Sequence, residues 1–193
     1  MRVWLRACAA VLSIAMPLAV GACSDPDPSP TPTPTPSVSA TTPSSSPTES
    51  AKPVVDTKVS AAVLTAYRGY WAARVTAQAH PTKPIPKELA TFAVDKAAAD
   101  VASSVSLFRQ QGIEVRGEPV LSPTVVSVSS GDLATASITD CVDSAHWLPV
   151  FVATGKSALP AGQPTRVVVE STASTYAGRW VIRTSSAFRD RTC

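Results

Sequence analysis

Asp140 is the residue in this sequence best suited to acid–base chemistry. It alternates with Ala134, Ala136, Ile138 and Val142, so in an extended strand these five side chains share one otherwise apolar face. A carboxyl group in apolar surroundings has a raised pKa unless it finds a partner. Such a group can move a proton beside a carbonyl while neutral donors hold the oxyanion. The pattern therefore predicts a buried acid, either inside the domain or at the mouth of a pocket.

Other residues could serve as hydrogen-bond donors or as a second titratable group beside such an acid. Tyr67 or Tyr70 could donate to an oxyanion, and His146 or Asp143 lies near the end of the same strand. A structural interpretation competes with this one and is favoured. Asp140 would then be hydrogen-bonded to a backbone amide or an arginine. The two tyrosines lie at helical spacing, which is typical of core packing, and His146 would belong to a loop that covers the end of the sheet.

The first 23 residues have the pattern of an export signal. Arg2 and Arg6 precede an uncharged run at 7–20, which is shorter than the roughly 20 residues that a membrane-spanning helix needs. The run ends in LAVGAC, which resembles the lipobox of bacterial lipoproteins. The resemblance implies that residues 1–22 are removed as a signal peptide and that Cys23 carries a diacylglyceryl group. Two acyl chains would tether the protein stably to the outer side of the cell membrane. An ordinary signal peptide with an incidental cysteine is the alternative.

The remaining cysteines predict a disulfide bond. Of the four cysteines, Cys8 leaves with the signal peptide and Cys23 carries lipid, so Cys141 and Cys193 remain in an oxidising compartment. Closing this loop of roughly 50 residues would stabilise the fold by about 4 kcal/mol in the chain-entropy model. A metal site or a reactive thiol is the alternative. A metal would need more ligands, and the sequence has only two histidines.

Composition divides the rest of the chain into a linker and one domain. Residues 23–56 are rich in Pro, Ser and Thr and are expected to form an extended or disordered spacer. Residues 57–193 are long enough for one core. They hold 14 basic and 10 acidic residues, a net charge of +4 that is spread along the domain. Nucleic-acid binding is therefore not expected. The sequence contains no GxSxG, HExxH or Gly-rich phosphate motif.

The domain is predicted to place helices first and strands after them. Apolar residues recur at helical spacing from Val59 to about Gln78, and again from Glu88 to Gln111 as one long or two shorter helices. Gly112 follows as a helix C-cap. The period then changes to two, which predicts strands at 115–121, 124–129, 133–142, 148–153, 166–176 and 179–188. Short turns between long strands require antiparallel pairing, so we expect an α+β domain with helices packed on one face of a curved sheet.

This order of elements resembles the NTF2-like (SnoaL-like) cone fold. The resemblance covers about residues 57–193 and includes a long terminal hairpin with Gly178-Arg179-Trp180-Val181-Ile182. One departure is that the short first strand, which the family places between the early helices, has no signal here. The family includes isomerases and cyclases with a pocket acid and tyrosine donors, but none of their catalytic motifs matches this chain residue by residue.

The last hairpin is predicted to have one core face and one solvent face. The other face would carry Glu170 and Arg183 as diagonal neighbours. Arg179, Arg183, Arg189 and Arg191 could instead form a patch for an anionic wall polymer or a partner. The predicted core face comprises Val167, Val169, Ala173, Trp180, Ile182 and Phe188.

Together these patterns favour a surface-tethered, non-enzymatic binding or interaction domain. Its partner would be an envelope protein, a cell-wall polymer or a small apolar molecule held in the cone, and the resemblance implies that the sheet could also pair into a homodimer. The alternative is a lyase, isomerase or hydrolase that uses Asp140 with help from Tyr67, Tyr70 or His146. No cofactor and no metal are predicted.

Overall fold

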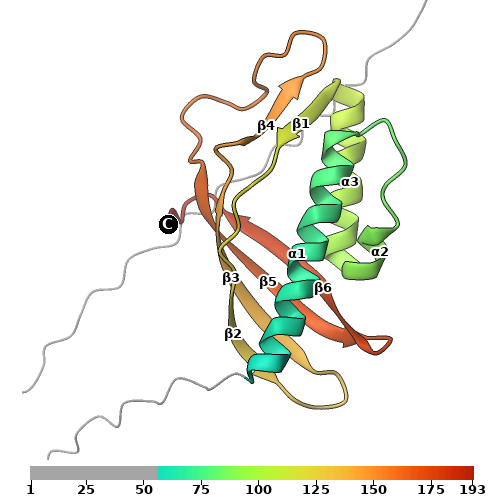
Figure 1. Cartoon of the computed structure of the whole chain (residues 1–193). Coiled ribbons are helices and arrows are strands. Elements are labelled where there is room, and N and C mark those ends of the chain that lie inside the picture. The colour runs from blue at the N-terminus through green and yellow to red at the C-terminus, as the bar shows by residue number, and fades with distance from the viewer. Residues whose placement is uncertain (1–55) are drawn as a thin grey trace, which may run out of the picture. The chain divides into compact units, whose positions relative to one another are not determined.

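The computed structural model describes residues 56–193, which form an α+β domain (Figure 1). The predicted signal peptide, the lipidated Cys23 and the linker up to residue 55 lie outside the described residues. Helices come first in the chain and pack against a curved antiparallel sheet, so the predicted fold class is confirmed. The elements are α1 (Thr57–Ala79), α2 (Glu88–Phe92), α3 (Asp95–Gln111), β1 (Ile113–Gly117), β2 (Thr124–Ser129), β3 (Thr135–Asp143), β4 (Trp147–Phe151), β5 (Arg166–Tyr176) and β6 (Arg179–Phe188).

Local sequence explains where the helices begin and end. Asp56 caps α1, because its side chain accepts hydrogen bonds from the N–H groups of Lys58 and Val59 at 2.8 and 3.0 Å. The helix ends at Ala79, before His80 and a proline. The predicted segment 88–111 is two helices, separated where the Val94 N–H leaves the helical pattern and donates to the Ile182 carbonyl at 3.0 Å.

The strands form two antiparallel sheets. The larger has the order β2-β3-β5-β6, and α1 crosses one of its faces (Figure 1). The smaller pairs β1 with β4 beside the ends of α1 and α3. Within residues 56–193 the strands do not close into a barrel. A parallel bridge between Ala93, which lies between α2 and α3, and Ile182 of β6 ties this segment to the larger sheet.

The core lies between the helices and the larger sheet. Val63, Tyr67 and Trp71 of α1 and Val101 of α3 are buried there with Ile138 of β3. The predicted inward face of β3 is confirmed, because Ala136, Ile138, Asp140 and Val142 are each at most 3% exposed. Strand phase thus places the carboxyl group of Asp140 inside the domain.

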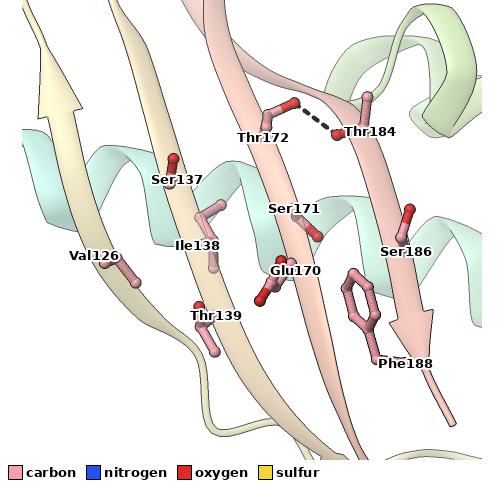
Figure 2. A pocket seen from close by; sticks show the side chains of 10 residues that line it. All are labelled: Val126, Ser137, Ile138, Thr139, Glu170, Ser171, Thr172, Thr184, Ser186 and Phe188. Carbon is pink, nitrogen blue, oxygen red and sulfur yellow. Dashed lines mark hydrogen bonds between the residues drawn. The ribbon is translucent and has the colours of Figure 1, made fainter. Parts of the chain in front are cut away.

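The predicted core face of the last hairpin is wrong at Phe188. A register shift between Thr172 and Ala173 leaves Arg183 without a direct partner on β5, so the alternation on β6 changes phase there. Phe188 therefore lies on the outer face, beside Glu170 (Figure 2).

The same register shift separates the expected Glu170–Arg183 pair. Glu170 forms an ion pair with Arg191 at 2.8 Å. Arg183 instead pairs with Asp95 at the start of α3 and donates a hydrogen bond to the Ser174 hydroxyl. The bulge thus joins the terminal hairpin to α3.

Candidate functional site

Both oxygens of the Asp140 carboxyl group accept a hydrogen bond. Its Oδ2 accepts from the Tyr67 hydroxyl at 3.0 Å, and its Oδ1 accepts from the backbone N–H of Ser122 at 2.6 Å. Asp140 is 1% exposed and Tyr67 is completely buried. Neither residue lines any of the cavities described below. The bond to a backbone amide is the arrangement that the structural interpretation of the sequence predicts.

Burial dominates the proton affinity of this pair. Burial raises the pKa of Asp140, while the Ser122 N–H, the Tyr67 hydroxyl and the charge of Arg68 lower it by a smaller amount. Burial raises the pKa of Tyr67 as well, and the nearby Asp140 charge adds to that rise. The nearby indole N–H of Trp71 lowers the pKa of Tyr67, which offsets part of this rise. Its position does not satisfy the distance and angle of a hydrogen bond. Tyr67 therefore remains a neutral donor to the acid.

The other predicted helpers do not gather around Asp140. Tyr70 is buried in the core and packs edge-on against Trp71, with ring centroids 6.1 Å apart. His146 is exposed in the turn before β4. Asp143 accepts a hydrogen bond from the Ala145 N–H and lies 3.9 Å from Arg166. The structure thus brings together only Asp140 and Tyr67 from the predicted set.

A separate cavity of about 340 Å³ lies at the β1–β4 end of the domain. Its walls come from α1, α3, β1, β4 and the loop that joins β4 to β5, which are neighbours at one end in Figure 1. Phe108, Ile113, Val115 and Leu159 provide apolar wall surface. A concave, mostly apolar space with a few polar groups is the usual form of a small-ligand site.

Hydrogen bonds hold the loop side of this cavity in place. The Ser144 N–H and hydroxyl both donate to the Thr165 carbonyl, at 2.7 and 2.8 Å. The Ala158 N–H donates to the Pro149 carbonyl of β4 at 2.9 Å. The loop is therefore tied to β4 near one end and to the turn between β3 and β4 at the other.

Arg74 of α1 is the partly buried charge that lines the cavity. Its guanidinium carbon lies 4.6 Å from the ring centre of Trp71 and 5.2 Å from that of Trp147. The two indoles meet edge to face, with centroids 5.5 Å apart. Cation–π contacts of this kind hold an arginine in position. Within residues 56–193, Arg74 forms no ion pair, and its Nε and the Nε1 of Trp147 are buried donors without an acceptor.

Polar side chains complete the lining. Gln78, one helical turn after Arg74, is 2% exposed, and its amide nitrogen donates to the Ser104 hydroxyl of α3 at 2.8 Å. Exposed Arg189 lies at the rim, where it donates to Gln163 at 3.3 Å. No aspartate or glutamate is among the residues that line the cavity.

A second concavity of about 380 Å³ lies on the outer face of the larger sheet (Figure 2). Figure 2 shows hydroxyl groups from three strands on this face, including Ser137, Thr172, Thr184 and Ser186. Two of these hydroxyls bond to each other across strands, Thr172 and Thr184, at 2.7 Å.

The predicted disulfide bond joins Cys141 of β3 to Cys193, with Cα atoms 5.9 Å apart. Among residues 56–193, no three His, Cys, Asp or Glu side chains are grouped so that they could hold a metal ion. In this part of the chain, no helix combines the length and the apolar character that crossing a bilayer requires.

Comparisons with known proteins add little to this geometry. No family model matches the chain, and no curated protein matches it. One similar solved structure is the intermembrane space region of the chloroplast protein ARC6, at 12% identity and a TM-score of 0.41. The match covers 70% of this chain and 98% of that one. A likeness this weak carries no argument about function.

Sequence reasoning did not single out the cavity or Arg74. A signal was present, because Trp71 and Arg74 are three residues apart and so share one face of a helix. Trp147 could not be added to them from sequence, because its place opposite α1 depends on the pairing of β4 with β1.

Proposed function

We propose that this protein is an extracytoplasmic lipoprotein whose NTF2-like domain binds a small ligand without catalysing a reaction on it. The observation that carries the binding role is the partly open cavity at the β1–β4 end, which has mostly apolar walls and an arginine in contact with two indoles. The lipobox-like sequence before Cys23 supports the tether. The helices packed on a curved antiparallel sheet are compatible with the NTF2-like resemblance.

The hydrogen bonds of Asp140 count against the alternative of a lyase, isomerase or hydrolase. A general base must come within hydrogen-bond reach of the proton that it removes. Both carboxyl oxygens of Asp140 are already engaged, by Tyr67 and by Ser122, and the pair is buried away from the cavity walls. A substrate in the cavity would meet Arg74 and glutamine side chains instead.

The tether is tested by changing the lipidated residue. We expect the full-length chain, expressed in a bacterium that lipidates exported proteins, to fractionate with membranes. The Cys23→Ala variant should be released in soluble form, because two acyl chains are needed for stable anchoring. Immunoblots of membrane and soluble fractions measure this. Equal distribution of the two forms would contradict the lipoprotein assignment.

The binding role is tested with N-phenyl-1-naphthylamine, a neutral apolar dye whose fluorescence rises in an apolar site. The exported Cys23→Ala chain is used, because acyl chains and detergent bind the dye themselves. We expect saturable binding of one dye per chain, lost in Leu159→Trp, which fills the cavity from its loop side. The control is Leu107→Trp, on an exposed position of α3 outside the cavity lining. Binding that is absent, or equal in the two variants, would contradict the proposed site.

A further inference from the structure

We infer that the cavity at the β1–β4 end selects a small organic anion, with its acidic group against Arg74 and its apolar body along the wall. The inference rests on the proposed binding function and adds the class of ligand. Both charged residues of the lining, Arg74 and Arg189, are cationic, and no acidic side chain lines the cavity.

The environment of Arg74 is the first argument for an anion. A buried or partly buried arginine is normally paired with a carboxylate, since burial of an unpaired charge is costly. Arg74 has no such partner within the described part of the chain, where its guanidinium is held by the two indoles alone. The guanidinium thus contacts both rings, and its N–H groups can donate to an anionic acceptor such as a carboxylate or a sulfonate.

The unpaired donors are the second argument. The Nε of Arg74 and the Nε1 of Trp147 are buried N–H donors with no acceptor among residues 56–193. Buried donors are almost always paired in folded proteins. Both belong to residues that line the cavity, and both atoms are covered by protein, so an acceptor on a ligand would reach them once these side chains shift toward the cavity.

The walls define the rest of the ligand. Phe108, Ile113, Val115 and Leu159 come from α3, β1 and the β4–β5 loop, and they offer no charge to the ligand body. Gln78 is committed to Ser104 through its amide nitrogen, so it keeps the inner wall fixed. An inorganic anion would leave this apolar surface uncovered. The combination fits an amphiphile with one acidic group, such as an aromatic or aliphatic carboxylate.

A matched pair of dyes separates charge from apolar contact. 8-Anilinonaphthalene-1-sulfonate has the N-phenyl-1-naphthylamine skeleton with one added sulfonate. For the exported Cys23→Ala chain, we expect the sulfonate dye to bind about 10-fold to 100-fold more tightly than the neutral dye, which is the usual range for a hydrogen bond to a charged group. Arg74→Gln should abolish this preference and leave the affinity for the neutral dye within about threefold of its original value, because the apolar walls remain.

Two further variants keep the test independent of folding. Arg74→Lys retains the charge and should keep part of the preference. Arg116→Gln removes an exposed arginine on β1 that pairs with Glu114, outside the cavity lining, and should change neither affinity. Circular dichroism confirms that each variant folds. Equal affinity of the two dyes, or a preference that survives Arg74→Gln, overturns the anion site while leaving the binding function standing. Failure of both dyes to bind overturns both.

Discussion

The carboxyl group of Asp140 joins three parts of the domain at one buried point. It lies on β3, it accepts a hydrogen bond from Tyr67 of α1, and it accepts another from the backbone of Ser122 in the segment between β1 and β2. Without the carboxyl group, the Tyr67 hydroxyl would be a buried donor with no acceptor, and the Ser122 N–H would lose its partner. At the scale of single residues, Asp140 is therefore a structural centre of the helix–sheet contact.

Two substitutions at Asp140 should show how much of its contribution to stability comes from its hydrogen bonds and how much from its charge. Asp140→Ala leaves the buried Tyr67 hydroxyl unpaired, which costs about 1–3 kcal/mol, so we expect a loss of at least about 1 kcal/mol in the free energy of unfolding. Asp140→Asn should lose much less, because its carbonyl can accept from Ser122 while its amide donates to the Tyr67 oxygen. Urea unfolding of both variants measures the difference. Equal losses would show that the hydrogen bonds contribute little.

The pH dependence of the same variants tests the raised pKa of Asp140. The folded protein holds the Asp140 proton more tightly than the unfolded chain, whose ordinary pKa is about 3.9. This contribution to stability is complete below the unfolded pKa and is lost as pH rises through the folded pKa. Relative to wild type, Asp140→Asn should therefore gain stability as the pH increases from the ordinary aspartate pKa toward neutrality. A relative loss over that interval would mean that the folded pKa is lowered.

The β1–β4 pair depends on a close backbone contact at the end of β1. Gly117 has φ of +80°, and a Cβ atom there would lie 1.9 Å from the backbone oxygen of His146. Gly112, at the C-cap of α3, has φ of +64° but open space around it. Both positions favour glycine for its conformational freedom, while only Gly117 also needs the absence of a side chain. The two residues flank the strand that forms one wall of the cavity.

Alanine at these two glycines should therefore have unequal effects. Gly112→Ala should cost about 1–2 kcal/mol, the usual penalty for a left-handed conformation. Gly117→Ala adds a collision with the backbone and should cost clearly more, because either β1 or the 144–146 turn must move. Urea unfolding measures both, and quenching of Trp147 fluorescence by acrylamide reports whether β4 has shifted. Equal losses of stability, with unchanged quenching, would contradict the role assigned to Gly117.

Element boundaries were predicted more reliably than the contacts between elements. The ranges 124–129, 166–176 and 179–188 match β2, β5 and β6, because alternation and the Ala177-Gly178 turn are local properties. The orientation of Phe188 was wrong, because the register shift at Thr172 and Ala173 depends on how two strands pair. A bulge of one residue changes the face of every later side chain on that strand.

At the scale of the whole molecule, the C-terminal end of the chain is bonded to the end of β3. The disulfide bond ties Cys193 to Cys141, and the Val168 N–H of β5 donates to the Arg191 carbonyl at 2.9 Å. The C-terminal residues are thus held along the larger sheet. Arg189, within this held segment, reaches the rim of the cavity and contacts Gln163 of the β4–β5 loop. The cavity is therefore assembled from segments that are far apart in the sequence.

The sequence by itself determined the class of the fold, the buried face of β3 and the pairing of Cys141 with Cys193. These properties follow from period, composition and counting, which one chain displays without its partners. Only the tertiary structure decided that both oxygens of Asp140 are bonded, by Tyr67 and Ser122, and that Arg74 contacts Trp71 and Trp147 at a cavity with no acidic side chain in its lining. The reason is physical: hydrogen bonds and ring contacts between distant residues depend on strand register and helix position, which no local pattern contains.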